Sequence, residues 1–272
     1  MNIVVCVKYV PDATADRHFE ADDTVDRVGV DGLLSELDEY ALEQALRIRE
    51  GSSDPGDADP ESTEVTVLTV GPEQAANAVR KALQMGADKG VHVVDDAIAG
   101  SDALATSLVL TKTLERLGSE SAWDLVVCGM ASTDGSMGVV PSMLSERLGV
   151  PGLTLGSEIT VERDTVRIRR DGDVATETVE GRLPLVLSVT DQSGEARYPS
   201  FKGIMAAKKK PVETWSLADI GVDADQVGLS SAWTTVQDTT ARPPRTAGEI
   251  VTDEDGSGAK ALVDFLAARK FI

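Results

Sequence analysis

The chain has 272 residues, of which 42% are hydrophobic, and 46 acidic against 26 basic side chains give it a formal net charge of -20. This length and hydrophobic fraction predict one large domain or two small ones with packed cores. No apolar run approaches the roughly 18 residues of a membrane span, and the N-terminus lacks a basic-then-apolar signal peptide, so we expect a cytoplasmic protein. The negative charge excludes a general nucleic-acid binder, which needs a basic face to neutralise phosphates.

The acidic side chains are spread along the whole chain instead of being gathered in one tail. A dispersed excess predicts a surface adapted to high salt, because counter-ions screen the self-repulsion that this charge causes at low ionic strength. We therefore expect a halophilic cytoplasm. An acidic docking surface is the alternative interpretation.

The first half of the chain alternates apolar runs with segments of helical period, a pattern typical of a mostly parallel sheet flanked by helices. The first run, residues 3–10, is rich in β-branched residues and nearly continuously apolar, as in a strand buried on both faces. The further strands of this half are expected at residues 64–70, 91–94 and 124–128. The helices are expected at residues 34–48, 72–85, 103–117 and 139–148, with a surface loop at residues 51–63. The sequence therefore predicts an α/β fold.

The pattern changes beyond Pro151. Short segments separated by polar turns predict an antiparallel patch and one more apolar strand, at residues 158–162, 165–170, 175–180 and 185–189. From Asp191 onward the chain has little continuous core pattern, apart from a last helix expected at residues 259–270. Because such a tail has few buried anchors, we expect it to lie on a partner subunit. The expected division is an α/β domain at residues 1–190 and a partner-binding part at residues 191–272.

A search for a catalytic centre finds no Cys-x-x-Cys, His-Glu-x-x-His, nucleophile-elbow or phosphate-loop motif. The two histidines, His18 and His92, are far apart in sequence, and His92 lies within a strand pattern, which favours a structural role. Cys6 and Cys128 lie in apolar runs and fit reduced core residues better than a disulfide framework. The sequence therefore predicts no metal site and disfavours an enzyme with its own acid–base chemistry.

A binding site is better supported, by the small-residue loop from Gly129 to Gly138. This loop follows a buried strand and opens a helix, so it lies where an open α/β sheet binds ligands and where free N–H groups can meet a phosphate. The hydroxyls of Ser132, Thr133 and Ser136 could add donors. An ordinary strand-to-helix turn is the alternative. Because a phosphate-loop lysine is lacking, a nucleotide held for structural reasons is favoured over one that is hydrolysed.

Several runs of residues also occur in a characteristic order. They are VVCVKYVPD, LSELDEYALEQALRIRE, LTVGPEQAANAVRKALQMGADKGVHV, DLVVCGMASTDGSMGVVPSMLSERLGVP, ETVEGRLPLVLSVT, RYPSFKGIMAAKKKPV and RPPRTAGEIV. Over nearly the whole chain, this order resembles the β subunit of electron-transfer flavoproteins. The acidic composition makes the chain similar to a halophilic, archaeal-type member.

The resemblance implies an adenine-nucleotide α-hydrolase-like fold that binds AMP and pairs with an α subunit holding most of the FAD. The C-terminal arm would wrap the α subunit. The complex would be an electron carrier, taking electrons from flavin dehydrogenases and passing them towards a membrane quinone reductase. Two alternatives stay open, a bifurcating variant with a second FAD in place of AMP and a stress-protein-type module that binds AMP or ATP.

The resemblance also implies particular contact residues. The AMP contacts carried over by position are Cys6, Ser35, Glu36, Leu37, Asp38, Val70, Gly129, Met130, Ala131, Ser132, Thr133, Asp134, Gly135, Ser136, Met137 and Gly138. The loop is shorter than in some relatives and differs in side chains, so backbone contacts to phosphate are the ones expected to persist. The expected contacts with partner dehydrogenases are Arg197, Tyr198, Phe201, Ile204 and Met205, with Phe201 as an apolar anchor. In the alternative, Phe201 and Met205 pack under their own domain.

Overall fold

The computed structural model describes residues 1–51, 63–240, 243, 248, 250–253 and 255–272. Most of the loop expected at residues 51–63, and of the run RPPRTAGEIV at residues 242–251, lies outside this described part. The chain divides into two units, Met1–Asp238 and Thr239–Ile272. Each unit is considered by itself.

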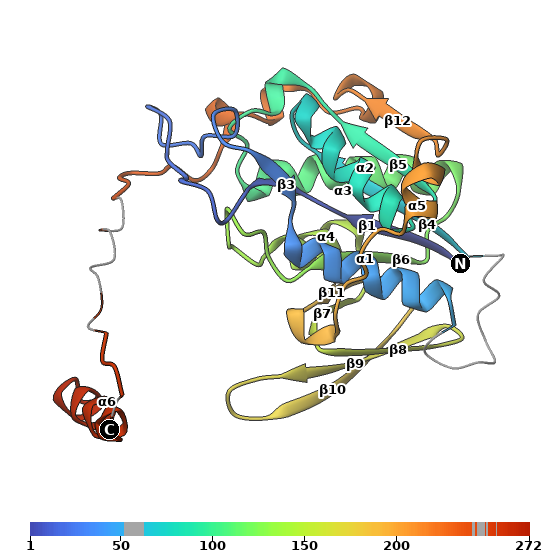
Figure 1. Ribbon diagram of the computed structural model, residues 1–272. Coiled ribbons are helices and arrows are strands. Elements are labelled where there is room, and N and C mark those ends of the chain that lie inside the picture. Colours follow the sequence, from blue (N-terminus) through green and yellow to red (C-terminus); the bar gives the residue numbers. More distant parts are fainter. Residues whose placement is uncertain (52–62, 241–242, 244–247, 249, 254) are drawn as a thin grey trace. The chain divides into compact units, whose positions relative to one another are not determined.

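The first unit is built on a seven-stranded parallel sheet with the strand order β12-β5-β4-β1-β6-β11-β7 (Figure 1). Its strands are β1 (Asn2–Cys6), β4 (Glu64–Val70), β5 (Lys89–Val93), β6 (Leu125–Gly129), β7 (Gly152–Gly156), β11 (Leu185–Val189) and β12 (Val212–Trp215). At the centre, Val5 pairs with Val67 on one side and Val127 on the other. Such β-branched residues suit strands that are covered on both faces. The predicted α/β class is confirmed.

Helices cover both faces of this sheet (Figure 1). They are α1 (Glu36–Arg49), α2 (Ala76–Met85), α3 (Ala103–Glu120), α4 (Val140–Leu148) and α5 (Phe201–Ala207). The apolar sides of α1 and α2 pack on one face, whereas those of α3 and α4 pack on the other. Local signals define the helix ends: the Asp102 carboxylate accepts the N–H of Ala105 at the start of α3 (2.9 Å), and Gly149 takes a left-handed conformation after α4. Single turns of 3-10 helix occur at Glu73–Ala75, Asp96–Ile98, Asp191–Ser193, Ala218–Ile220, Ala224–Gln226 and Leu229–Ser231.

Two small antiparallel sheets complete the first unit. The first consists of β8 (Glu158–Glu162), β9 (Thr165–Asp171) and β10 (Thr176–Arg182), which confirms the predicted patch. The second pairs β2 (Tyr9–Pro11) with β3 (Gly32–Leu34). The single strand expected at residues 3–10 is therefore split. The break follows from Lys8, whose backbone N–H turns away from the sheet and donates to the Asp38 carboxylate (2.8 Å).

The segment after Asp191 contributes more to the core than its sequence suggests. Strand β12 forms the sheet edge beside β5, and the apolar side chains that follow it are buried against α3 and its neighbours. These side chains are Leu217, Ile220, Val222 and Val227, together with Trp215 at the end of β12 itself. The four that follow the strand lie in or beside turns and 3-10 helices, so they show neither helical nor strand periodicity. The expectation of few buried anchors is wrong for this stretch.

The second unit contains helix α6 (Ser257–Ala268), close to the predicted helix. Its apolar side chains, among them Leu262, Val263 and Phe265, are exposed. Within the described residues, no helix is both long enough and apolar enough to cross a membrane.

Candidate functional site

The structure brings the predicted nucleotide contacts together at the carboxyl ends of three adjacent strands. Strands β4, β1 and β6 lie side by side at the centre of the sheet, and they end at Val70, Cys6 and Gly129. The start of helix α1 lies over the same ends, because the carboxylate of Asp38 accepts the N–H of Lys8 and the carbonyl oxygen of Leu37 lies only 2.7 Å from where a side chain on Gly129 would begin. This crevice is the position where parallel α/β sheets bind ligands.

The loop between β6 and α4 has the backbone geometry of an anion site. Ser136 and Gly138 both have left-handed φ angles, of 52° and 65°. Within the described part of the chain, the N–H groups of Met137, Gly138 and Val139 donate to no protein group, and the free N–H groups of the first turn of α4 follow. Successive free N–H groups next to left-handed residues form a concave cradle that suits a phosphate.

Asp134 holds this loop in place from inside the protein. Its carboxylate is almost fully buried and forms ion pairs with Lys8 (2.9 Å) and Arg27 (2.6 Å). Burial alone would raise the pKa of Asp134, but the two neighbouring cations lower it well below its usual range. Arg17 adds a hydrogen bond to the carbonyl oxygen of Thr133 (3.1 Å). Asp134 therefore acts on the shape of the loop, and its carboxylate is already occupied by cations of its own chain.

Lys8, Arg17 and Arg27 are residues that the sequence analysis missed. The latter two lie in the excursion between β2 and β3, and more than a hundred residues separate them from the loop that they contact. The only sequence signal was the presence of basic residues in an otherwise acidic segment, at residues 12–31.

Asp38 and Ser35 lie at the start of α1, beside the same strand ends. Asp38 is buried, and burial raises its pKa to about 7 although the backbone N–H groups of Lys8 and Gly129 donate to it. Ser35 precedes α1, and its buried hydroxyl has no hydrogen-bond partner within the described residues. The hydroxyl of Thr69, on the neighbouring strand β4, is also buried without a partner there. Because buried hydroxyls normally have partners, these two groups are candidates for hydrogen bonds to a polar ligand.

The remaining predicted contacts differ in exposure. Cys6 and Cys128 are free and buried, as expected, and the pKa of the Cys128 thiol is raised by its hydrogen bond with Cys6 and by burial. Glu36 and the loop residues from Gly135 to Gly138 are exposed, whereas those from Met130 to Thr133 are partly buried. His92 has the structural role expected of it, with Nε2 3.1 Å from the carbonyl oxygen of Gly71.

A second candidate surface is the docking segment, which we define as residues 198–207. It presents the exposed side chains of Tyr198, Phe201, Ile204 and Met205, and Phe201 is 81% exposed. The alternative in which Phe201 packs under its own domain is therefore wrong. Arg197, also expected to contact a partner, forms ion pairs with Glu43 and Glu50 of its own chain.

Comparison with known proteins identifies the family. The electron transfer flavoprotein domain family matches residues 22–220. Over 272 residues, the chain is 46% identical to the electron transfer flavoprotein subunit beta of Mycobacterium tuberculosis (strain ATCC 25618 / H37Rv) and to that of Mycobacterium leprae (strain TN), covering 100% of this chain and 99% of each relative. It is 34% identical to the caffeyl-CoA reductase-Etf complex subunit CarD of Acetobacterium woodii, over 93% of this chain and 92% of that relative. The chain belongs to the electron transfer flavoprotein family, as a β subunit.

Proposed function

We propose that this β subunit holds AMP in the crevice between β1, β4 and β6, within a heterodimer whose α subunit carries most of the FAD. The observation that supports AMP most directly is the cradle of free N–H groups at Met137, Gly138 and Val139. This cradle would bind the phosphate, and the unpartnered hydroxyl of Ser35 would bind another polar group of the nucleotide. The FAD supplies the redox chemistry when bound, whereas this chain's residues bind and orient.

In this proposal the heterodimer accepts electrons from flavin dehydrogenases and passes them towards a membrane quinone reductase. The docking segment supports such a carrier role, because it exposes an aromatic anchor beside basic residues. The crevice supports a binding role over catalysis of its own, because its buried carboxylates are engaged with backbone N–H groups or with cations. The assignment of residues 191–272 to a recognition loop and an arm that wraps the α subunit stays a prediction.

The nucleotide content of the purified α/β complex tests this function against its alternatives. One FAD and one AMP per complex, released by acid and quantified by chromatography, is the expected result. Two FAD without AMP would instead indicate the bifurcating variant, whose second FAD would occupy the same crevice. Failure to form a complex with an α subunit would favour an isolated nucleotide-binding module of the stress-protein type.

Replacing Gly138 with valine should reduce the AMP retained by the complex. A β-branched side chain at a φ of 65° costs about 1–2 kcal/mol of backbone strain and displaces the neighbouring N–H groups. The matched control is Met137→Leu, since this methionine is 58% exposed and the leucine leaves the backbone unchanged. Equal AMP content in the two variants would show that the loop is not the phosphate cradle. Gly129 is unsuitable for this test because its substitution would collide with the backbone of Leu37.

Replacing Phe201 with alanine should weaken docking to a dehydrogenase without destabilising the fold. An exposed aromatic anchor that fills a partner's pocket contributes about 2 kcal/mol or more, which corresponds to roughly tenfold to hundredfold in affinity. The measurement is the half-saturation concentration for the dehydrogenase, together with a thermal melt. Val174→Ala is the control, because Val174 is a fully exposed apolar residue on the distant β9–β10 turn. A lowered melting temperature with unchanged docking would contradict the prediction.

A halophilic, archaeal-type origin and a cytoplasmic location remain predictions from the sequence. The comparisons lend no support to the former, and the dispersed acidic excess is its only basis. Melting temperatures of the heterodimer in low salt and in molar KCl test the adaptation to salt. A halophilic surface should gain stability with added salt, because counter-ions screen its self-repulsion.

A further inference from the structure

The docking segment lies between two charged residues, Arg197 and Lys210. Arg197 bonds to helix α1, and Lys210 bonds to the end of helix α2. The segment itself rests on the C-terminal end of α2, where the α5 backbone approaches so closely that a side chain on Gly203 would begin 2.5 Å from the carbonyl oxygen of Gln84. The outward face carries the exposed anchor residues described above. The segment therefore has a supported inner face and a free outer face.

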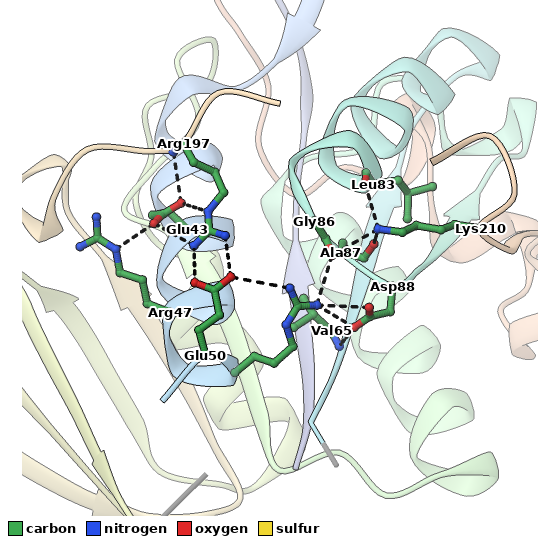
Figure 2. Close-up of polar contacts among 11 residues, drawn as sticks. Glu43, Arg47, Glu50, Val65, Leu83, Gly86, Ala87, Asp88, Arg197 and Lys210 are labelled. Carbon is green, nitrogen blue, oxygen red and sulfur yellow. Dashed lines mark hydrogen bonds and ion pairs between the residues drawn. The ribbon is translucent and has the colours of Figure 1, made fainter. Parts of the chain in front are cut away.

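Arg197 fixes the start of the segment to helix α1 (Figure 2). Its guanidinium donates from Nη1 and Nη2 to the two carboxylate oxygens of Glu50 (2.6 and 2.8 Å), and from Nε to Oε2 of Glu43 (2.7 Å). The backbone N–H of Arg197 donates to the same Glu43 oxygen (3.1 Å). A side chain engaged in this forked arrangement has few donors left for a second protein.

Glu43, which binds Arg197, is held rigidly in the protein because it is only 4% exposed. Burial would raise the pKa of Glu43, but hydrogen bonds from Arg197 and Arg47 lower it below its usual value, so the carboxylate stays ionised. The Nε atom of Arg47 binds the other carboxylate oxygen (2.8 Å). A buried ionised carboxylate strongly favours keeping its cationic partners.

Lys210 fixes the end of the segment to helix α2 (Figure 2). Its ammonium donates to the carbonyl oxygens of Leu83 (3.1 Å), Gly86 (3.3 Å) and Ala87 (2.5 Å). These carbonyls lie at the C-terminal end of the helix, where they lack helical partners and where the helix dipole favours a cation. The next residue, Pro211, accepts the N–H of Gly90 (3.0 Å), so the chain enters the sheet edge directly after this anchor.

Arg49 links the two anchors. It donates to both carboxylate oxygens of Asp88 (3.2 and 3.1 Å) and to the carbonyl oxygen of Gly86, which Lys210 also binds. On its other side it lies 4.0 Å from the Glu50 carboxylate that binds Arg197. Helices α1 and α2 are thus joined beneath the segment by one continuous polar network.

We propose that Arg197 and Lys210 are positioning residues that hold the docking segment in one conformation before a partner binds. This inference rests on the proposed docking function, and it changes the expected role of Arg197 from touching the partner to orienting Phe201. Holding a loop in its bound conformation removes the entropic cost of ordering it during association. Loss of either anchor should therefore weaken docking although neither side chain meets the dehydrogenase.

The test uses the α/β complex with Arg197→Met, Arg197→Lys and Lys210→Met, each alone and combined with Phe201→Ala. Arg182→Met is the charge-matched control, because this side chain is exposed and lies on β10. The readouts are the half-saturation concentration for a flavin dehydrogenase, the maximal rate, and amide hydrogen exchange of residues 200–207 without the partner. Exchange in β1, β4 and β6, with the FAD spectrum, reports whether each variant is folded.

Arg197→Met should speed exchange of residues 200–207 and raise the half-saturation concentration about tenfold at an unchanged maximal rate. Arg197→Lys should show smaller changes in exchange and in half-saturation concentration than Arg197→Met, since a lysine reaches one carboxylate but cannot form the fork. In the Phe201→Ala background the same change should raise half-saturation less than twofold, because a positioning residue acts through the anchor. Lys210→Met should likewise raise the half-saturation concentration less in the Phe201→Ala background than in the presence of Phe201.

If Arg197→Met raised the half-saturation concentration by the same factor in the presence of Phe201 and in the Phe201→Ala background, Arg197 would contact the partner directly. This result would overturn the proposal. An unchanged exchange rate or an unchanged half-saturation concentration in both Arg197→Met and Lys210→Met would overturn it too. Failure of the docking function itself is visible separately, because Phe201→Ala alone would then leave half-saturation unchanged.

Discussion

Replacing Trp215 with alanine should lower the free energy of unfolding by about 3–5 kcal/mol, the usual cost of deleting a buried aromatic side chain. Trp215 is 4% exposed, although it lies in a part of the chain whose sequence suggests no core. Its indole packs with the α3 cluster, and the Arg116 guanidinium lies 4.1 Å from its ring centroid. Alanine would leave a cavity beside α3 and remove the cation–π contact. Urea unfolding followed by circular dichroism measures the change.

Trp233→Ala is the matched control, because Trp233 is 87% exposed and only its backbone N–H bonds to Asp102. Its truncation should change stability by no more than about 0.5 kcal/mol. Equal losses in the two variants would contradict the placement of Trp215 in the core.

The second large effect is a pH dependence of stability caused by Asp38. Burial raises the pKa of this carboxyl from 3.8 to about 7, so the folded state binds more protons than the unfolded state between these values. Asp38 should therefore make stability fall as the pH rises from about 4 to about 7. At 1.36 kcal/mol for each pKa unit, its cost at neutral pH is about 4 kcal/mol.

The measurement is the slope of unfolding free energy against pH between 5 and 7, in the natural chain and in Asp38→Asn. The variant cannot titrate, so its slope should be more positive than that of the natural chain. Asp134→Asn is the comparison with the opposite sign. The lowered pKa of Asp134 gives stability that is present above the unfolded pKa of 3.8 and is lost as the pH falls. Asp134→Asn should therefore lower stability at neutral pH, leave the slope between pH 5 and 7 unchanged, and alter the slope only in acid. Parallel slopes in the natural chain and in Asp38→Asn would contradict the assignment.

The central sheet was predictable because its strands are buried on both faces and so appear as continuous apolar runs. Strands β4 and β11 match their predicted bounds, and helices α3 and α4 begin within one residue of prediction. Strand β7 was missed, since its five residues include two glycines and its sequence does not resemble a strand. Strand β12 was missed as well, because only Trp215 among its four residues is buried.

The candidate site was predictable where it depends on backbone position and unpredictable where it depends on pairs of side chains. The loop at Gly129–Gly138 and the start of α1 are brought together by the strand order, which a parallel α/β pattern implies. The ion pairs of Asp134 with Lys8 and Arg27 join distant parts of the chain, and no local pattern encodes them. The same is true of the bond between Arg197 and Glu43, which are separated by 154 positions.

The strand order determines the stage of folding at which the docking segment is positioned. Strands β11 and β12 are consecutive along the sequence but lie five positions apart in the sheet, a span of about 24 Å at the usual strand spacing. The connection at residues 190–211, which contains the docking segment, crosses this span, so the two ends of that segment acquire their places only after both sides of the sheet have assembled. If only part of the sheet has formed, this connection is not held at both ends and Phe201 has no fixed orientation. In the proposed docking role, a subunit whose sheet is incomplete should therefore fail to bind a partner dehydrogenase.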